Sequence, residues 1–395
     1  MIKRKAADLL LRYAKFYPVV TVTGPRQSGK TTMVRMTFPL KDYVNLENLD
    51  TRTFAREDPR GFLAGYPYGA ILDEIQHVPQ LLSYIQTLVD EKRKNGMFIL
   101  TGSAQLKMME SVSQSLAGRT ALIKLLPFDL EEAYSKTQLE KITLNEILYR
   151  GFYPRIFDQK LNPSEALSFY FETYIQRDVR TLLNVSDLLM FERFMQLCAG
   201  RTAQPVNFSS IASDLGISSN TVRSWISVLQ ASFIIELLPP YHQNLNKRIT
   251  KAPKLYFIDV GLASFLLRIN KPETLHTHPL KGQLFESFVI SEILKYRYQN
   301  GQRPDMYFFR DKAGNEADLI LNYSQNFFPI EIKSSQTYHP EFTKSLRYLE
   351  KIAPVKVKNM GVVYGGERSQ QIKNIDVCGF RELLSMIKRV DNLYA

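Results

Sequence analysis

The sequence predicts an α/β protein made of three successive parts. Up to about residue 137 (residues 1–137), apolar strands alternate with helices, as a parallel three-layer domain requires. In residues 138–250, apolar side chains recur with a period near 3.6, which indicates helices. In residues 251–395, strand-like runs return between amphipathic helices. At 395 residues, each part is long enough to bury a core of its own.

A phosphate-binding loop follows the first apolar run of the chain. Residues 24–31 read G-x-x-x-x-G-K-T and come directly after the apolar residues 19–22. A buried strand would deliver this loop, and the next helix would offer its free backbone N–H groups to an anion. Lys30 would then reach the β- and γ-phosphates, and the hydroxyl of Thr31 would bind Mg²⁺. We expect the site for ATP to be lined by Gly24, Pro25, Arg26, Gln27, Ser28, Gly29, Lys30, Thr31 and Thr32.

Two further apolar runs end in polar residues that suit phosphate chemistry. Residues 70–72 are followed by Asp73, expected to hold Mg²⁺, and by Glu74, placed to accept a proton from the attacking water. An Asp-Glu pair can also be an ordinary helix cap, and the pair alone leaves that alternative open. Residues 97–101 lead to Ser103, expected to sense the γ-phosphate. A strand lying between the loop strand and the Asp-Glu strand would fit the P-loop ATPases that carry a catalytic glutamate (ASCE).

Arg119 is the candidate for stabilising the charge that develops during phosphoryl transfer. The sequence does not say whether it would act in its own subunit or from a neighbour. Arg26 and Arg177 are alternatives, and an ordinary surface arginine is an equally good interpretation of each.

A helix-turn-helix pattern lies within the helical part. Ala212 is small where two helices would cross, Gly216 can form the turn, and Ser218 can cap the second helix. The strand-like residues 233–238 follow, so a winged helix is expected over about 205–240.

The function of this winged helix stays open at the sequence level. The exposed face of its second helix would carry Asn220 and Arg223 but little other positive charge, whereas groove-reading helices usually bring more. DNA contact and a lid or interface role are therefore both retained. Basic residues that could form a phosphate-binding wing follow: Lys247, Arg248, Lys251 and Lys254.

The third part contains an acidic hairpin. Asp318 lies in the run 316–321, and Glu331 and Lys333 lie two residues apart in the run 328–333, so strand pleating places them on one face. Asp318 and Glu331 would coordinate Mg²⁺, and Lys333 would orient or deprotonate water. Glu286, on the preceding helix, is a candidate third metal ligand. The order of helices and strands is that of a restriction-endonuclease-like fold; the alternative is an exposed hairpin with ordinary charges.

Composition narrows the class of protein. The net charge of +12 and pI near 9.4 favour acidic partners, with nucleic acid first. Two cysteines without metal or disulfide spacing indicate a reducing compartment. No apolar run reaches transmembrane length, and the first 16 residues have helical rather than signal-peptide patterning. We expect a cytoplasmic protein that does not engage a membrane.

Taken together, these motifs resemble the prokaryotic AAA-type ATPases that carry a winged helix and a C-terminal domain of unknown function related to restriction endonucleases. The resemblance rests on the runs 71–76, 174–179 and 251–262 as well as on the loop. It implies ATP binding, a connection to duplex or branched DNA, and a nuclease-type residue set of Glu286, Asp318, Glu331 and Lys333. Rings are common in this superfamily, so a homo-oligomer is kept as an option, although the sequence does not give the oligomeric state.

Two functions are retained from the sequence. In the first, a Mg²⁺-dependent ATPase acts on DNA, and its nuclease-like domain cleaves DNA. In the second, the protein is a non-cutting, nucleotide-dependent switch whose endonuclease fold only binds nucleic acid or a protein partner. A transporter or signalling ATPase is disfavoured because no membrane segment is apparent.

Overall fold

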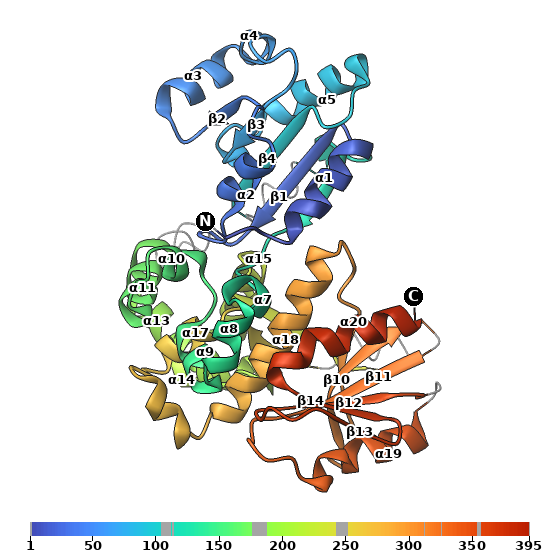
Figure 1. The fold of residues 1–395 in the computed structure, drawn as a ribbon. Coiled ribbons are helices and arrows are strands. Elements are labelled where there is room, and N and C mark those ends of the chain that lie inside the picture. Colours follow the sequence, from blue (N-terminus) through green and yellow to red (C-terminus); the bar gives the residue numbers. More distant parts are fainter. Residues whose placement is uncertain are drawn as a thin grey trace.

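The computed structural model describes residues 2–103, 112, 114–175, 188–241, 252–311, 313–324, 326–353 and 357–394. The N-terminal part forms one unit, and the middle and C-terminal parts lie together beneath it (Figure 1). No helix of the described residues has the length and apolar character that a membrane crossing needs.

The N-terminal unit is built on a five-stranded parallel sheet of order β2-β3-β4-β1-β5. Its strands are β1 (Val19–Gly24), β2 (Tyr43–Asn45), β3 (Ile71–Asp73), β4 (Phe98–Ser103) and β5 (Thr120–Lys124). Its helices are α1 (Ala6–Phe16), α2 (Lys30–Thr37), α3 (Leu49–Glu57), α4 (Pro59–Ala64), the short η1 (Ile75–His77) and α5 (Leu81–Lys92). Strand β4 lies between β1 and β3, so the predicted inserted strand is confirmed. Because all five strands are parallel, the ends of β1, β3 and β4 meet at one edge, where ligands bind in such sheets.

The middle part is mainly helical. Its helices are α7 (Leu130–Ala133), α8 (Lys136–Lys141), α9 (Leu144–Arg150), α10 (Pro154–Asp158), α11 (Pro163–Tyr170), η2 (Phe171–Ile175), α13 (Leu188–Gly200), α14 (Phe208–Leu215), α15 (Ser219–Ala231), α17 (Val260–Leu266) and η3 (Pro272–His276). Gly216 adopts the left-handed conformation (φ 68°) between α14 and α15, and Ser218 caps α15 by accepting from the N–H of Thr221 at 3.0 Å. The helix-turn-helix geometry that the sequence predicts is therefore present.

A small antiparallel sheet follows the two helices and changes the expected boundary. It has the order β6-β8-β7, formed by β6 (Gln204–Pro205), β7 (Ile235–Leu238) and β8 (Lys254–Phe257). Because β8 pairs with strands from both sides of the helix-turn-helix, the middle part continues past residue 250 to about the end of η3. The predicted boundary at 250/251 was wrong, since pairing between strands distant in sequence was not visible in the local pattern.

The C-terminal part is a six-stranded mixed sheet of order β13-β14-β12-β11-β10-β9. Its elements are α18 (Lys281–Gln299), β9 (Met306–Arg310), β10 (Glu316–Tyr323), β11 (Asn326–Lys333), η4 (Pro340–Thr343), α19 (Lys344–Ile352), β12 (Met360–Tyr364), β13 (Gln370–Ile372), β14 (Ile375–Gly379), η5 (Phe380–Glu382) and α20 (Leu383–Tyr394). Helix α19 packs against one face of the sheet, and α18 and α20 pack against the other.

One continuous core joins the middle and C-terminal parts, with members from Leu126 to Val390. Helix α18 runs through it and is buried on nearly all sides, including the ion pair of Glu292 with Lys295 at 2.8 Å. In Figure 1, α18 extends from this core toward the N-terminal unit. It therefore contacts the N-terminal unit, at β5 and α1, as well as the core of the other two parts.

Candidate nucleotide site and acidic pocket

The loop after β1 has the backbone geometry of an anion-binding turn. Gly24 ends the strand so close to the carbonyl of Leu125 that a Cβ there would lie 2.1 Å from its oxygen. Gly29 has φ 86° and precedes the first residue of α2, Lys30. The side-chain oxygens of Thr23 and Ser28 are buried without a hydrogen-bond partner in the described residues. The loop therefore offers unsatisfied polar groups as well as a helix N-terminus to a ligand.

Lys30 lies inside this loop without an ion-pair partner among the described residues. Its Nζ donates to the carbonyl oxygens of Gly24 at 3.1 Å and Pro25 at 2.9 Å. Burial lowers the pKa of Lys30 to about 8, which the charges of Glu74 and Asp73 offset only in part. A phosphate would supply the negative charge that this buried ammonium lacks.

Asp73, at the end of β3, collects three hydroxyl groups. It accepts from Thr31 at 3.0 and 3.1 Å, from Tyr43 at 2.8 Å, and from Thr101. A buried carboxylate beside the Thr31 hydroxyl is a hard-oxygen donor set of the kind that Mg²⁺ takes. The residues present therefore fit this ion, and Thr31 and Asp73 are the residues that would hold it.

Glu74 and Ser103 are joined through a residue that the sequence analysis did not single out. The amide Nε2 of Gln76 donates to the Glu74 carboxylate and, at 3.1 Å, to the Ser103 hydroxyl. Glu74 itself has φ 56°, a left-handed conformation that is uncommon for a residue with a side chain. The ends of β3 and β4 are thus coupled through one amide.

A cavity of about 590 Å³ opens beside the loop, large enough for a nucleoside. Its walls come from the loop and α2, from the N-terminal segment, and from α10; they include Arg4, Leu11, Gln27, Gly29, Thr32, Met33, Met36, Phe128, Pro154 and Arg155. The sequence analysis missed Arg4 and Arg155, because both are distant in sequence from the loop they approach.

Arg119 lies away from this site. It immediately precedes β5, and β5 runs parallel to β1, so it occupies the sheet edge opposite the loop. Its guanidinium pairs with Asp90, with Nε at 2.6 Å and Nη2 at 2.8 Å. The structure therefore does not bring Arg119 to the phosphate loop of its own subunit, and of the two modes of action left open by the sequence, action on a neighbouring subunit stays a prediction. Arg177 lies outside the described residues.

The structure brings the predicted acidic residues together in a pocket of about 530 Å³ at the C-terminal sheet. The hairpin pairing of β10 with β11 places Asp318 beside Glu331, and the N–H of Ile332 donates to Asp318 at 2.8 Å. Lys333 contacts Glu331 at 2.5 Å and Asp318 at 3.8 Å. Glu286 joins them from α18.

Lys254 was predicted to belong to an exposed wing, and this was wrong. It lies on β8 with only 3% of its surface exposed and forms ion pairs with Glu286, at 3.1 Å, and with Glu316. Tyr256, two residues on, donates to Glu286 at 2.6 Å. The other proposed wing residues, Lys247, Arg248 and Lys251, lie outside the described residues.

The electrostatics of the acidic pocket show crowded negative charge. Burial and the neighbouring Asp318 raise the pKa of Glu286 and of Glu331 to about 7. Burial would lower the pKa of Lys254, but its three neighbouring carboxylates raise it well above the usual range. The carboxylates Glu286, Glu316, Asp318 and Glu331 face three cations, Lys254, Lys333 and Arg310.

This pocket fits Mg²⁺ only in part. Its oxygen donors are the right type, but the lysines lie among them, and no three acidic, histidine or cysteine side chains of the described residues are arranged to hold a metal. The predicted ligand set Asp318, Glu331 and Glu286 thus converges on one pocket without forming a metal-binding arrangement there.

Comparison with known families supports the assignment of the N-terminal part. Residues 17–134 match a family described as an AAA domain. Residues 141–273 and 281–383 match two families, each described as a domain of unknown function (DUF8612 and DUF4143). Together with the loop, the AAA match supports an ATP-binding ATPase of the AAA type with a parallel-sheet P-loop domain.

Relatives and solved structures add the following likenesses. An uncharacterized protein of Mycobacterium tuberculosis, Rv2008c, and one of Mycobacterium bovis, Mb2031c, are each 27% identical over the whole of this chain and 87% of their own length. The Walker-type ATPase PABY2304 of Pyrococcus abyssi is 15% identical with a TM-score of 0.37, over 67% of this chain and 95% of that one. AMPPCP-bound DnaA of Aquifex aeolicus is 15% identical with a TM-score of 0.31, over 57% and 85%.

Proposed function

We propose that the chain binds Mg²⁺–ATP at the loop of residues 24–31 and hydrolyses it, and that this ATPase acts on DNA. The observation that carries the first part is the contact of Thr31 with Asp73 next to a buried Lys30 that has no ion-pair partner among the described residues. A magnesium ion and a phosphate would supply the charges that this arrangement lacks.

Each residue of the site is proposed to have a role that follows from its position. Lys30 would turn from the loop carbonyls to the β- and γ-phosphates, and Thr31 and Asp73 would hold Mg²⁺, which would supply positive charge against the phosphates. Glu74 accepts the proton of the attacking water. The amide of Gln76 keeps Glu74 and Ser103 in a fixed relation at the γ-phosphate end of the loop.

Isothermal titration with a non-hydrolysable ATP analogue and Mg²⁺ tests nucleotide binding. Lys30→Ala should abolish it, because the β/γ charge loses its partner. Lys15→Ala, which removes an exposed lysine from α1, should bind as wild type does. Tight binding by the Lys30→Ala variant would refute the assignment of the loop.

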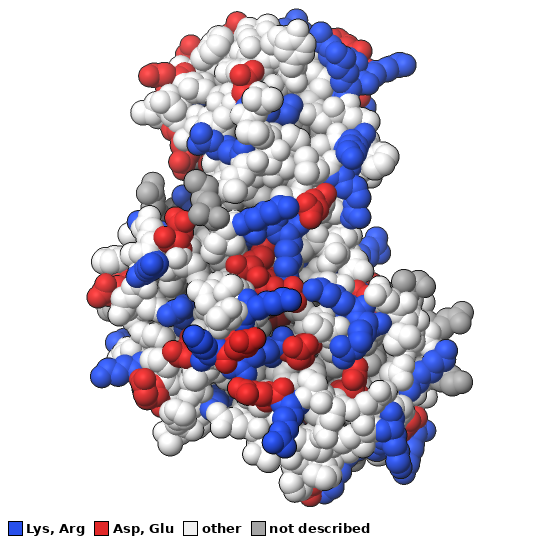
Figure 2. Space-filling view, in the orientation of Figure 1, with Lys and Arg blue, Asp and Glu red and all other residues white. Residues whose placement is uncertain are grey.

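DNA is the second part of the proposal and rests on three observations. The chain has a net charge of +12, it contains a helix-turn-helix, and its acidic pocket combines carboxylates with Lys333 of the hairpin and Lys254 of β8. Basic and acidic side chains are intermixed on the face shown in Figure 2, so a DNA path would follow local basic stretches. If phosphate contacts dominate, the affinity must fall steeply with salt; a flat dependence would contradict them.

Metal-dependent DNA cleavage is kept as a second candidate activity because Asp318, Glu331 and Lys333 meet in one pocket, although the lysines now occupy the carboxylates that a metal would need. Asp318 and Glu331 would hold the metal, with Glu286 as a further ligand, once Lys333 turned toward water or phosphate. The test is cleavage of single-stranded, duplex and branched DNA with Mg²⁺ or Mn²⁺, comparing wild type with Asp318→Ala and Lys333→Ala. Cleavage by wild type alone supports a nuclease, whereas binding without cleavage supports the non-cutting switch.

Two further features complete the proposal. We place the protein in the cytoplasm, consistent with free, buried thiols at Cys198 and Cys378. A homo-oligomer would allow Arg119 to reach the phosphate site of a neighbouring subunit. Light scattering with and without nucleotide checks this, and a monomer under both conditions would remove Arg119 from the reaction.

A further inference from the structure

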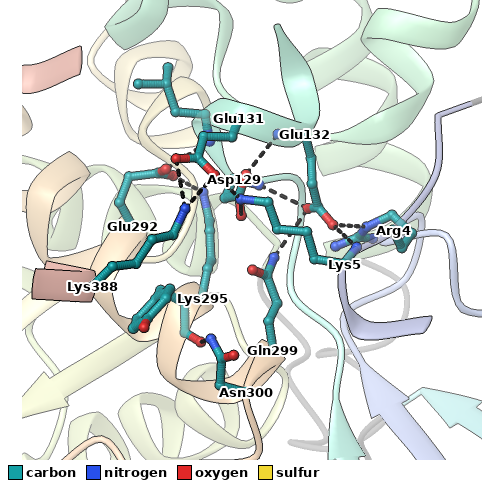
Figure 3. Close-up of polar contacts among 12 residues, drawn as sticks. Arg4, Lys5, Asp129, Glu131, Glu132, Glu292, Lys295, Gln299, Asn300 and Lys388 are labelled. Atoms are coloured by element: carbon teal, nitrogen blue, oxygen red, sulfur yellow. Dashed lines mark hydrogen bonds and ion pairs between the residues drawn. The ribbon is translucent and has the colours of Figure 1, made fainter. Parts of the chain in front are cut away.

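Arg4, just before α1, connects the phosphate loop to Glu132. Figure 3 shows its contact with Glu132. Its side chain is buried, and Nη1 donates to the carbonyl of Ser28 in the loop at 2.5 Å. Nη2 donates to the carbonyl of Leu126 at 2.8 Å, and the guanidinium lies over the ring of Phe128 at 4.9 Å. A guanidinium held at so many points has little freedom to follow a movement of the loop by itself.

Glu132, on α7, also accepts a hydrogen bond from Arg4 and connects it to three other residues. Its Oε1 accepts from Arg4 Nε at 3.1 Å and from the backbone N–H of Lys5 at 2.7 Å. Its Oε2 accepts from the N–H of Asp129 at 3.1 Å and from Gln299 Nε2 at 3.2 Å. A buried carboxylate with two donors on each oxygen cannot shift without breaking at least one of them.

Gln299 is the last residue of α18, and Glu286 of the acidic pocket lies near the start of the same helix. Gln299 follows Glu286 by 13 positions, which correspond to about 20 Å of helix. The helix is buried along this length, and the Glu292 carboxylate accepts from the N–H of Leu130 at 2.7 Å, which ties α18 to α7 a second time. A displacement at one end of such a helix moves the other end.

Nucleotide binding is expected to change the conformation of the loop. Lys30 now donates to the carbonyls of Gly24 and Pro25, and a phosphate would compete for its ammonium group. Ser28, whose carbonyl Arg4 holds, lies between these residues in the loop. Release of the two carbonyls would alter the backbone on which Arg4 is anchored.

We propose that the series of hydrogen bonds that joins Ser28, Arg4, Glu132 and Gln299 couples the nucleotide site to the acidic pocket through α18. The proposal rests on nucleotide binding at the loop, as proposed above. Because such coupling is reciprocal, a ligand in the acidic pocket would change nucleotide affinity by the same factor.

A fluorescent label at Gly282→Cys reports on the acidic pocket. Gly282 lines that pocket and is exposed, and a Cβ there would meet only Ser334 Oγ at 3.8 Å. The native thiols, Cys198 and Cys378, are both buried, so a thiol-reactive dye would label the new cysteine selectively. The labelled protein is titrated with a non-hydrolysable ATP analogue at constant Mg²⁺, and calorimetry measures binding in parallel.

Two variants distinguish coupling through Glu132 and Gln299 from a general effect of mutating the surrounding polar network. Gln299→Met removes the contact to Glu132 and leaves α18 otherwise intact. Lys388→Met is the matched control: Lys388, on α20, bonds Glu131 at 3.0 Å, and Glu131 in turn bonds Lys5 (Figure 3). Within the described residues, the side chains of these three residues make no hydrogen bond to the loop of residues 24–31. Circular dichroism and thermal unfolding establish that both variants fold.

The proposal expects a fluorescence change that saturates with the calorimetric affinity, survives Lys388→Met and is largely lost in Gln299→Met. Nucleotide binding without any fluorescence change in the labelled wild type would overturn the coupling while leaving the proposed ATP site intact. Equal loss in Lys388→Met and Gln299→Met would overturn the assigned route. Absence of nucleotide binding in calorimetry would overturn both the proposed function and the coupling.

Discussion

Lys30 should make nucleotide binding depend on pH. In the free protein its pKa is lowered to about 8, because burial outweighs the charges of Glu74 and Asp73, and Arg26 lowers it further. A bound triphosphate would restore the pKa toward the ordinary value of 10.5. Binding at a pH between these two values must therefore take up a proton.

The size of the effect follows from the two pKa values. Between pH 7.5 and 9.5 the free protein loses the Lys30 proton while the complex keeps it, so the affinity should fall roughly 20-fold, or ~1.8 kcal/mol. The lowered pKa of Lys30 also makes the free energy of unfolding depend on pH. The unfolded chain keeps this proton up to 10.5, so the stability of the nucleotide-free protein should rise with pH from 8 to 10.5. The destabilising contribution of Lys30, on the order of 3 kcal/mol, is fully present below pH 8.

Calorimetry in two buffers of different ionisation enthalpy measures the nucleotide affinity and the number of protons taken up on binding. At pH 9 we expect an uptake of about 0.9 proton on binding. Lys30→Arg is the control, because a guanidinium stays charged throughout this range, so its affinity should not follow this titration. A wild-type affinity that is flat from pH 7.5 to 9.5, with no proton uptake, would refute the argument.

Three other predictions concern the neighbours of the two sites. Tyr43→Phe removes one hydroxyl from Asp73 and should weaken Mg²⁺–ATP binding by about 1 kcal/mol without affecting ADP binding in chelator; equal losses would place its role outside the metal site. Gln76→Leu should lower kcat for ATP hydrolysis by about tenfold or more with little change in KM, and a change in KM alone would contradict a positioning role. Lys254→Met removes a buried ammonium from between two partly buried carboxylates, Glu286 and Glu316, and should cost about 3 kcal/mol in denaturant unfolding, whereas Arg310→Met, at the exposed edge, should cost far less; similar values would contradict the described burial of Lys254.

Local patterns predicted much of this fold. The loop, the Asp73-Glu74 strand and the acidic hairpin each lie within a few residues of sequence, where strand alternation and turn chemistry decide the structure. A strand inserted between the loop strand and the Asp73-Glu74 strand was expected to fit an ATPase with a catalytic glutamate, and the sheet order shows that β4 is that strand. The convergence of Asp318, Glu331 and Lys333 followed from strand pleating alone.

The remaining features depend on contacts between distant residues, which a single sequence does not reveal. Arg119 precedes a strand rather than following one, and only the sheet register shows that this places it at the wrong edge. Lys254 belongs to a basic stretch of the sequence, but the pairing of β8 with β6 and β7 places it in the acidic pocket. Arg4 and Glu132 are 128 residues apart, so their contact has no local signature.

Steady-state ATP hydrolysis by wild type and by Glu74→Gln tests the central claim most directly. The substitution keeps the size of the side chain and removes the group that accepts the proton. The account predicts Mg²⁺-dependent hydrolysis by wild type, and a rate lower by roughly 10² or more in Glu74→Gln with ATP binding retained. Unchanged turnover in Glu74→Gln, or no hydrolysis by a wild-type protein that binds Mg²⁺–ATP, would contradict it.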